Sequence, residues 1–257
     1  MNGLLKDKNI LIMGISNKWS IAWGIAKACY GAGANLFLSC LDERTEKGVR
    51  ELCKDMEGVK FYRCDVTEDR QIEDMFDAIK KDADILHGVV HSLAFAKKEE
   101  LEGAYYDTSR EGYHLAQDIS AYSLVAVSRY AKPLMIDGGG SIVTLTYLGG
   151  ERAVPNYNVM GVAKAALEAS VKYLAVDLGA HNIRVNAISA APIKTVSARG
   201  VRDFTTMLKD YEEKIPLKEP ITQSEIGDTA LFLLSPLSRG ITGENIHVDG
   251  GYHILGI

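Results

Sequence analysis

The chain has 257 residues, with 29 Lys and Arg against 34 Asp and Glu, and a formal net charge of −5 at pH 7. Its hydrophobic fraction of 47% and charged fraction of 25% are ordinary for a folded protein, which excludes wholesale disorder. The mildly acidic balance, without a long run of Lys and Arg, gives no basic surface for nucleic acid or anionic lipid, so neither is expected as a partner.

Membrane insertion and secretion are not expected either. No apolar stretch reaches the roughly 18 to 20 residues that a membrane span needs, and the first residues lack the apolar block of a signal peptide. The four cysteines, Cys29, Cys40, Cys53 and Cys64, form no Cys-x-x-Cys pair and have no nearby histidine cluster. We therefore expect a cytoplasmic protein with buried free thiols and no metal site.

Short β-branched or apolar runs alternate with longer segments of helical period along the whole chain, which is typical of βαβ units and a parallel sheet. The runs predict strands at Asn9 to Met13, Ala34 to Ser39, Lys60 to Arg63, Ile85 to Ser92, Ser141 to Thr146, Ile183 to Ser189 and Asn245 to Val248. Helical spacing predicts helices at Ser20 to Ala32, Arg44 to Glu57, Glu68 to Lys81, Asp118 to Met135 and Asn158 to Leu178.

The expected fold is a single α/β domain over residues 1–257, a Rossmann-type doubly wound sheet of seven parallel strands with helices on both faces. The run from Ile85 to Ser92 is almost continuously apolar, as in a strand that helices cover on both sides. Ligands of such sheets bind at the carboxyl ends of the strands. Residues 190–220 are long, polar and uneven, and we interpret them as an insertion that covers the substrate.

A glycine turn follows the first strand, between Gly14 and Gly24, and leads directly into a helix. Small residues let the backbone turn tightly and let the helix approach the sheet, and the amides near Ser20 and Ile21 are placed to hold a pyrophosphate at the positive end of the helix dipole. The turn is not a regular Gly-x-Gly-x-x-Gly, and a glycine turn before a helix is often structural only.

The next two strand ends bear on the nucleotide. Acidic residues Asp42 and Glu43 after the second strand can bond ribose hydroxyls and repel a 2′-phosphate, which favours NAD, whereas Arg44 can neutralise the extra phosphate of NADP. After the third strand, Asp65 is placed to accept a hydrogen bond from the adenine amino group. Its alternative role is to cap the following helix.

Tyr157 and Lys164 are seven residues apart, which closes two helical turns and places both side chains on one helix face. A nearby ammonium favours phenolate character and so eases proton transfer from tyrosine. Taken alone, the pair also fits a core tyrosine and a solvated lysine. Its combination with a nucleotide-binding end, and with Tyr147 at the end of the fifth strand, favours the catalytic interpretation.

These motifs together resemble the bacterial enoyl-acyl carrier protein reductases, a divergent branch of the short-chain dehydrogenase/reductase superfamily. The resemblance spans essentially the whole chain and includes residues 14–26, His91 to Ala96, the Tyr-x9-Tyr-x6-Lys pattern, Arg184 to Ala187 and Gly243 to Gly251. The separation of seven between tyrosine and lysine is characteristic of this branch, since ordinary superfamily members have four.

The resemblance implies reduction of an enoyl thioester on acyl carrier protein by NADH, in a homotetramer. It implies that Tyr147, Tyr157 and Lys164 are the catalytic residues. Tyr157 would hydrogen-bond the thioester carbonyl, Lys164 would bind the nicotinamide ribose, and Tyr147 and Ala96 would line the acyl site beside Tyr157. The remaining cofactor contacts fall on Gly14, Ser20 and Ile21 for the pyrophosphate, Asp65 and Val66 for the adenine, and Leu93 and Ile193 beside the adenosine and nicotinamide.

Two departures bear on the cofactor. Ala191 stands where the family commonly has glycine, and its methyl group is expected to crowd the nicotinamide carboxamide or shift the loop. Cys40 and Leu41 occupy the stretch that discriminates the two cofactors and match neither a phosphate clamp nor an acidic block, so NADH is favoured with NADPH as the alternative donor.

Residues 195–214 are expected to fold as one or two short helices over the substrate. Phe204, Met207 and Leu208 either cover the acyl chain or form a small core under a loop, while Arg199, Arg202 and Lys209 are candidates to face the acidic carrier protein. Two other functions stay open at this point: a short-chain alcohol or carbonyl dehydrogenase, and a nucleotide-sensing protein without turnover.

Overall fold

The computed structural model describes residues 3–195 and 201–256. It contains one 7-stranded sheet in the order β3-β2-β1-β4-β5-β6-β7, and every pair of neighbouring strands is parallel. The strands are β1 (Asn9–Met13), β2 (Asn35–Cys40), β3 (Lys60–Arg63), β4 (Gly88–His91), β5 (Gly140–Thr146), β6 (Ile183–Ala190) and β7 (Asn245–Val248). This is the predicted doubly wound Rossmann-type fold.

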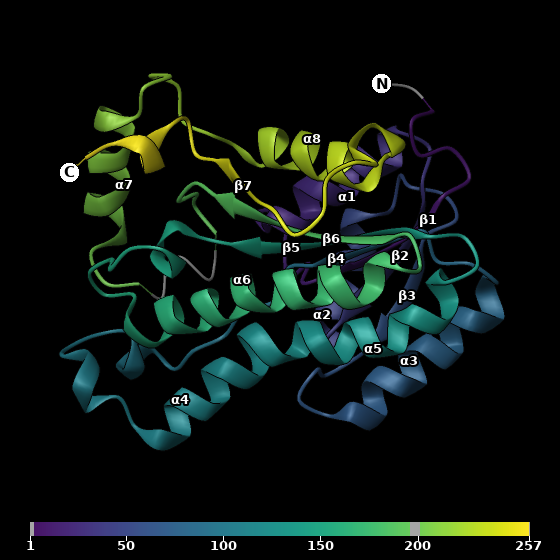
Figure 1. Cartoon of the computed structure of the whole chain (residues 1–257), viewed down its shortest axis with the longest axis horizontal. Helices are drawn as coiled ribbons and strands as arrows, with labels where there is room; N and C mark the ends of the chain where they lie inside the picture. Colours follow the sequence, from purple (N-terminus) through teal and green to yellow (C-terminus); the bar gives the residue numbers. More distant parts are fainter. Residues whose placement is uncertain (1–2, 196–200, 257) are drawn as a thin grey trace.

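Helices cover both faces of the sheet (Figure 1). They are α1 (Ile21–Gly31), α2 (Glu43–Leu52), α3 (Asp69–Asp82), α4 (Arg110–Gln117), α5 (Ser123–Met135), α6 (Asn158–Gly179), α7 (Phe204–Lys214) and α8 (Gln223–Leu234). One face carries α1 and α8, and the other carries α3, α5 and α6 (Figure 1). The alternating side chains of the central strands feed two separate cores: Ile10 and Ile12 pack toward α1, and Leu11 and Met13 toward α3.

Most predicted elements are confirmed, and four details differ. The fourth strand is shorter than Ile85 to Ser92, because the Leu86 N–H donates to the carbonyl of Leu134 in the last turn of α5 instead of to a neighbouring strand. The helix expected at Arg44 to Glu57 ends at Leu52. The helix expected at Asp118 to Met135 begins with a π-helical turn, η3 (Asp118–Tyr122), and the separate helix α4 before it was not predicted.

Gly24 has a different role from the one expected. A Cβ atom built there would lie 2.6 Å from the carbonyl oxygen of Gln223 at the start of α8, so the glycine lets α1 pack against α8 rather than against the sheet. The expectation for the cysteines is confirmed, since Cys29, Cys40, Cys53 and Cys64 are buried and free. Among the described residues, no helix combines the length and apolar character that a membrane crossing requires.

Candidate active site

A cleft of about 950 Å³ opens at the carboxyl ends of the strands, within the size range of small-molecule sites. Its walls come from the segments that follow β1 to β6 and from α7. The structure brings all the site residues predicted from the sequence to this cleft: Gly14, Ser20, Ile21, Asp65, Val66, Leu93, Ala96, Tyr147, Tyr157, Lys164 and Ile193. Their individual roles remain predictions.

The turn after β1 is built for close backbone approach. Gly14 has a φ of +95°, and a Cβ atom there would lie 2.0 Å from the Ser92 carbonyl oxygen, so only glycine fits. Ser20 is the N-cap of α1, but its hydroxyl accepts the N–H groups of Ser16 and Asn17, both at 3.1 Å, and does not cap its own helix. The first turn of α1 carries no acidic residue. The start of this helix therefore suits an anionic ligand.

Asp42, which was expected to bind the ribose, has a structural role in this fold. Asp42 is the N-cap of α2, where its carboxylate accepts the Thr45 N–H at 2.7 Å, and this hydrogen bond lowers the pKa of the carboxyl group. Leu41 and Thr45 line the cleft at this strand end. Asp65 does line the cleft, and its carboxylate also accepts the N–H and the hydroxyl of Thr67, at 3.0 and 2.8 Å. The capping alternative for Asp65 is thus partly realised as a turn before α3.

The loop after β4 is held by a buried polar network that the sequence did not indicate. His91 is completely buried, with its ring nitrogens 2.9 Å from the Thr144 hydroxyl and 2.8 Å from the Ser123 hydroxyl. Burial lowers the pKa of His91 to about 3, with Lys164 adding to the effect, so the ring is neutral. The Ser120 hydroxyl accepts the Phe95 N–H at 3.0 Å. Together these contacts fix Leu93 to Ala96 along the cleft wall.

Tyr157, Tyr147 and Lys164 all line this cleft. Tyr157 is the N-cap of α6, directly before the helix that carries Lys164. The rings of Tyr147 and Tyr157 are edge to face, with centroids 5.1 Å apart, which fixes the orientation of Tyr157. The Tyr147 hydroxyl donates to the Met207 sulfur at 3.8 Å.

The electrostatics of this group follow from burial. Lys164 is only 5% exposed, and its ammonium donates to the Leu145 carbonyl oxygen at 2.8 Å. Desolvation lowers the pKa of Lys164 to about 8, although the Glu168 carboxylate works in the opposite direction. Burial raises the pKa of Tyr147 to about 12 and raises the pKa of Tyr157 as well, so both phenols are protonated at neutral pH.

Helix α7 closes one side of the cleft. Phe204 and Met207 line the cleft, whereas Leu208 packs with Ala191, Tyr211 and Ile215 in a small core below. The small core is thus confirmed for Leu208, with Phe204 packed against it, while the covering of an acyl chain by Phe204 and Met207 stays a prediction. Arg199 lies outside the described residues. Arg202 pairs with Glu102 at 3.8 Å, and Lys209 pairs with Glu213 at 3.9 Å, both on the surface.

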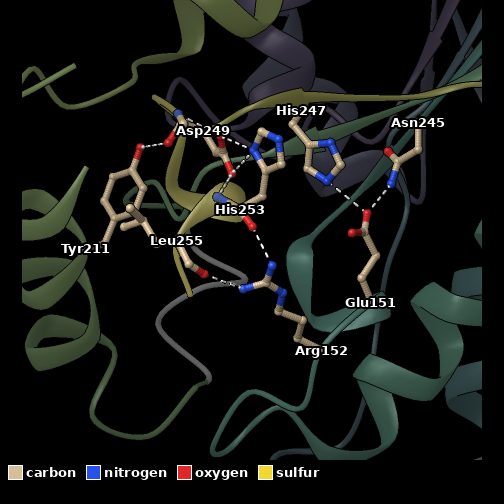
Figure 2. A network of polar contacts seen from close by, with 9 residues as sticks. Glu151, Arg152, Tyr211, Asn245, His247, Asp249, His253 and Leu255 are labelled. Carbon is tan, nitrogen blue, oxygen red and sulfur yellow. Dashed lines mark hydrogen bonds and ion pairs between the residues drawn. The ribbon is translucent and has the colours of Figure 1, made fainter. Parts of the chain in front are cut away.

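A polar network ties the C-terminal segment to the loop after Tyr147 (Figure 2). The Arg152 guanidinium donates to the carbonyl oxygens of His253 and Leu255, at 2.6 and 2.9 Å. The Tyr211 hydroxyl of α7 donates to the Asp249 carbonyl oxygen at 3.0 Å, and the Asp249 carboxylate accepts the His253 N–H at 2.8 Å. Figure 2 shows how these contacts connect α7, the end of β7 and the loop at Arg152. Sequence reasoning missed them because they join distant segments.

Other lining residues were also missed. Ile119 and Met160 line the cleft from the π-helical turn η3 and from α6. Nothing in the local pattern indicates η3, since a single extra residue in a helical turn leaves the apolar spacing almost unchanged.

Comparison with known proteins agrees with this geometry. The family model described as enoyl-(acyl carrier protein) reductase matches residues 14–253. An enoyl-[acyl-carrier-protein] reductase [NADH] from Bacillus cereus is 58% identical over 255 residues, covering 98% of this chain and 99% of that protein. The chain belongs to the enoyl-acyl carrier protein reductase family.

Other members of this reductase family are similar over equal lengths. An enoyl-[acyl-carrier-protein] reductase [NADPH] from Staphylococcus aureus is 54% identical and is covered to 98% of its length, as is this chain. The crystal structure of the Bacillus cereus reductase with NADP+ and indole naphthyridinone superposes with a TM-score of 0.97 and 57% identity over 100% of both chains. The Aquifex aeolicus reductase (NADH) structure gives a TM-score of 0.95 at 46% identity, covering 99% of this chain and 100% of that one.

Proposed function

We propose that this protein reduces the trans-2 double bond of enoyl-acyl carrier protein thioesters with NADH, the last reductive step of fatty acid elongation. The observation that carries the proposal is that Tyr157 and Lys164 line the same cleft as the glycine turn and the start of α1. A phenol and an ammonium beside a dinucleotide cradle are what reduction of a conjugated thioester needs. Membership of the reductase family supports the same activity.

The residues present fit a dinucleotide. Gly14 lets the turn after β1 lie against the Ser92 carbonyl, where a Cβ would lie 2.0 Å away, and Ser20 and Ile21 present the start of α1 to the cleft. Asp65, Val66 and Leu93 would hold the adenosine, and Lys164 and Ile193 the nicotinamide side. The basic residues among the described lining are Lys98 and Lys164, and neither lies at the end of β2, where a 2′-phosphate would need a partner. This supports NADH, with NADPH as the alternative donor.

The protein's own contribution to the reaction is orientation and charge stabilisation. When bound, a reduced nicotinamide would provide the hydride for the β-carbon of the thioester, which would leave negative charge on the thioester oxygen. The Tyr157 hydroxyl donates a hydrogen bond to that oxygen and becomes its proton donor. The Lys164 ammonium stabilises the resulting phenolate and holds the ribose, while the Tyr147 ring keeps Tyr157 in place.

The acyl chain would lie beside Ala96, Tyr147 and Tyr157, under the segment of residues 190–220. Phe204 and Met207 of this segment face the cleft, which supports its role as a substrate-covering insertion within one domain over residues 1–257. The exposed Arg202 and Lys209 are available to the acidic carrier protein, because their surface ion pairs are worth little in water.

A homotetramer is also part of the proposal. Two large apolar side chains of α6 are almost fully solvent-exposed in the single chain, Tyr173 at 77% and Val176 at 79%. Packing of this helix against a second copy would remove both from water. A cytoplasmic location fits a substrate carried by acyl carrier protein.

An absorbance assay of the reduced nicotinamide tests the function. We expect a crotonyl thioester to oxidise NADH, with NADPH slower, and an acetoacetyl thioester to leave both unchanged. Oxidation with the acetoacetyl substrate alone would instead support the alternative, a short-chain carbonyl dehydrogenase. Tight NADH binding without turnover of either substrate would support a nucleotide-sensing protein.

A further inference from the structure

A second, smaller cavity of about 150 Å³ lies next to α6, with none of its lining shared with the large cleft. Three carboxylate residues, Glu151, Glu168 and Glu244, line it together with Lys172 and Asn245. Such a polar cavity is large enough for several water molecules. The mechanism above uses none of these residues.

Glu168 is the residue that brings this cavity next to the reaction centre. It lies one turn after Lys164 on α6, so the two side chains leave the same face of the helix. The Thr146 hydroxyl, which lines the large cleft, donates to the Glu168 carboxylate at 2.6 Å. A Cβ at Gly150 would lie 2.5 Å from the same carboxylate, so the glycine leaves room for it. Glu168 therefore lines the small cavity and at the same time contacts Thr146, a residue of the large cleft.

The reaction consumes one proton in each turnover in addition to the hydride. The Tyr157 hydroxyl and the Lys164 ammonium provide the proton for the first turnover. Both groups face a cleft that the cofactor and the acyl chain fill during turnover. Lys164 is 5% exposed and its ammonium is turned toward Leu145, so bulk water does not reach it directly. Its proton has to be replaced from outside the large cleft, and Glu168 on the same helix face lines a second cavity there.

Resting on the proposed function, we propose that Glu168 and the small polar cavity deliver the solvent proton that restores Lys164 and Tyr157 after each reduction. Tyr157 breaks its O–H bond to protonate the substrate, and Lys164 then breaks an N–H bond to restore the phenol. The neutral amine takes a proton from the Glu168 carboxyl group, which takes one from water in the cavity. The sum is one solvent proton per hydride.

The proposed route includes a water molecule between the Lys164 amine and the Glu168 carboxyl group, because the first donates to the Leu145 carbonyl oxygen and the second accepts the Thr146 hydroxyl. Burial raises the pKa of Glu168, which brings the acid closer to neutrality than an exposed glutamate. The charged and titratable groups that surround it are Lys164 and Lys172 on α6, Glu151 in the loop after Tyr147, and Glu244 and His247 at β7.

The far end of the cavity is also polar. The Glu151 carboxylate accepts a hydrogen bond from the Asn245 side-chain amide at 2.8 Å and lies 2.9 Å from Nε2 of the His247 ring, as Figure 2 shows. The His247 ring stacks on His253 with centroids 3.9 Å apart. Glu168 acts through Lys164 and is a positioning and proton-supplying residue.

Glu168→Gln tests the route, because glutamine keeps the shape and can still accept from Thr146 but holds no acidic proton. In rapid mixing with saturating NADH and crotonyl-coenzyme A, we expect the first turnover at nearly the parent rate, followed by a steady state at least about tenfold slower. The solvent isotope effect on the slow phase should rise, and the KM for NADH should stay within about twofold. Glu168→Asp should recover part of the rate.

Glu244→Gln is the matched control, since Glu244 lines the same cavity with an exposed side chain that does not contact Thr146. Its kcat should equal that of the parent. A Glu168→Gln variant with the kcat of the parent and no burst overturns the route. A variant whose first turnover and steady state are slowed by the same factor also overturns it, because that result marks a structural role. Should Glu168→Gln not fold, Glu168→Asp must show the burst. A parent enzyme that does not oxidise NADH contradicts the proposed function instead.

Discussion

The hydroxyl of Tyr157 is the group on which the proposed chemistry depends most directly. Tyr157→Phe removes this donor and keeps the ring, so the edge-to-face contact with Tyr147 at 5.1 Å is retained. One donor aimed at a developing oxyanion is worth about 3 to 4 kcal/mol of barrier, and we therefore expect kcat to fall by about two to three orders of magnitude. The KM for NADH should change little, because the hydroxyl acts mainly in the transition state.

The assay is NADH oxidation with a crotonyl thioester, with thermal unfolding measured in parallel. Tyr147→Phe is the matched control: it removes a phenolic hydroxyl from the same cleft, where the partner is only the Met207 sulfur at 3.8 Å. Its loss of kcat should be below about tenfold, because a weak sulfur acceptor contributes little. If Tyr157→Phe loses no more activity than Tyr147→Phe, another donor or a water molecule stabilises the oxyanion and the reasoning is refuted.

Three further predictions concern the cofactor side of the cleft. Lys164→Met should abolish activity yet stabilise the free protein at pH 7 by up to about 3 kcal/mol, because the lysine pKa falls from 10.5 to about 8 on folding. Between pH 8 and 10.5 the unfolded parent chain binds more protons than the folded one, so the parent's free energy of unfolding should rise relative to that of the variant. A difference in urea unfolding that does not change with pH would contradict this. Gly14→Ala should weaken NADH binding and lower Tm by several degrees, because its Cβ would lie 2.0 Å from the Ser92 carbonyl oxygen, and an unchanged KM for NADH would argue against the cradle. Asp42→Ala should lower Tm slightly at neutral pH, an effect lost as acid protonates the low-pKa carboxyl group, and should leave the KM for NADH unchanged; a raised KM would return Asp42 to the ribose.

Local patterns in the sequence determined the layers of this protein. Strands β1, β3 and β7 begin and end at the predicted residues, because apolar runs of four or five residues between turn residues can form little else. Helix α6 was likewise visible from its spacing, and the same spacing predicts that Tyr157 and Lys164, seven residues apart, share one side of the helix.

Tertiary contacts decided what the patterns left open. Asp42 was expected to meet the ribose, and the Thr45 N–H at the start of α2 made it a helix cap instead. Phe204, Met207 and Leu208 looked equivalent, and the packing of α7 on Tyr211 sent Leu208 to a core and left the other two at the cleft.

What the sequence alone determined is thus the order of strands and helices and the residue types at each strand end, because periodicity and turn chemistry act over a few neighbouring residues. Only the folded chain decided the partner of each polar group. His91 with Ser123, Thr146 with Glu168, and Arg152 with Leu255 are 32, 22 and 103 residues apart. Burial sets the pKa of Lys164 for the same reason, since desolvation depends on every segment that packs around a group and not on its neighbours in sequence.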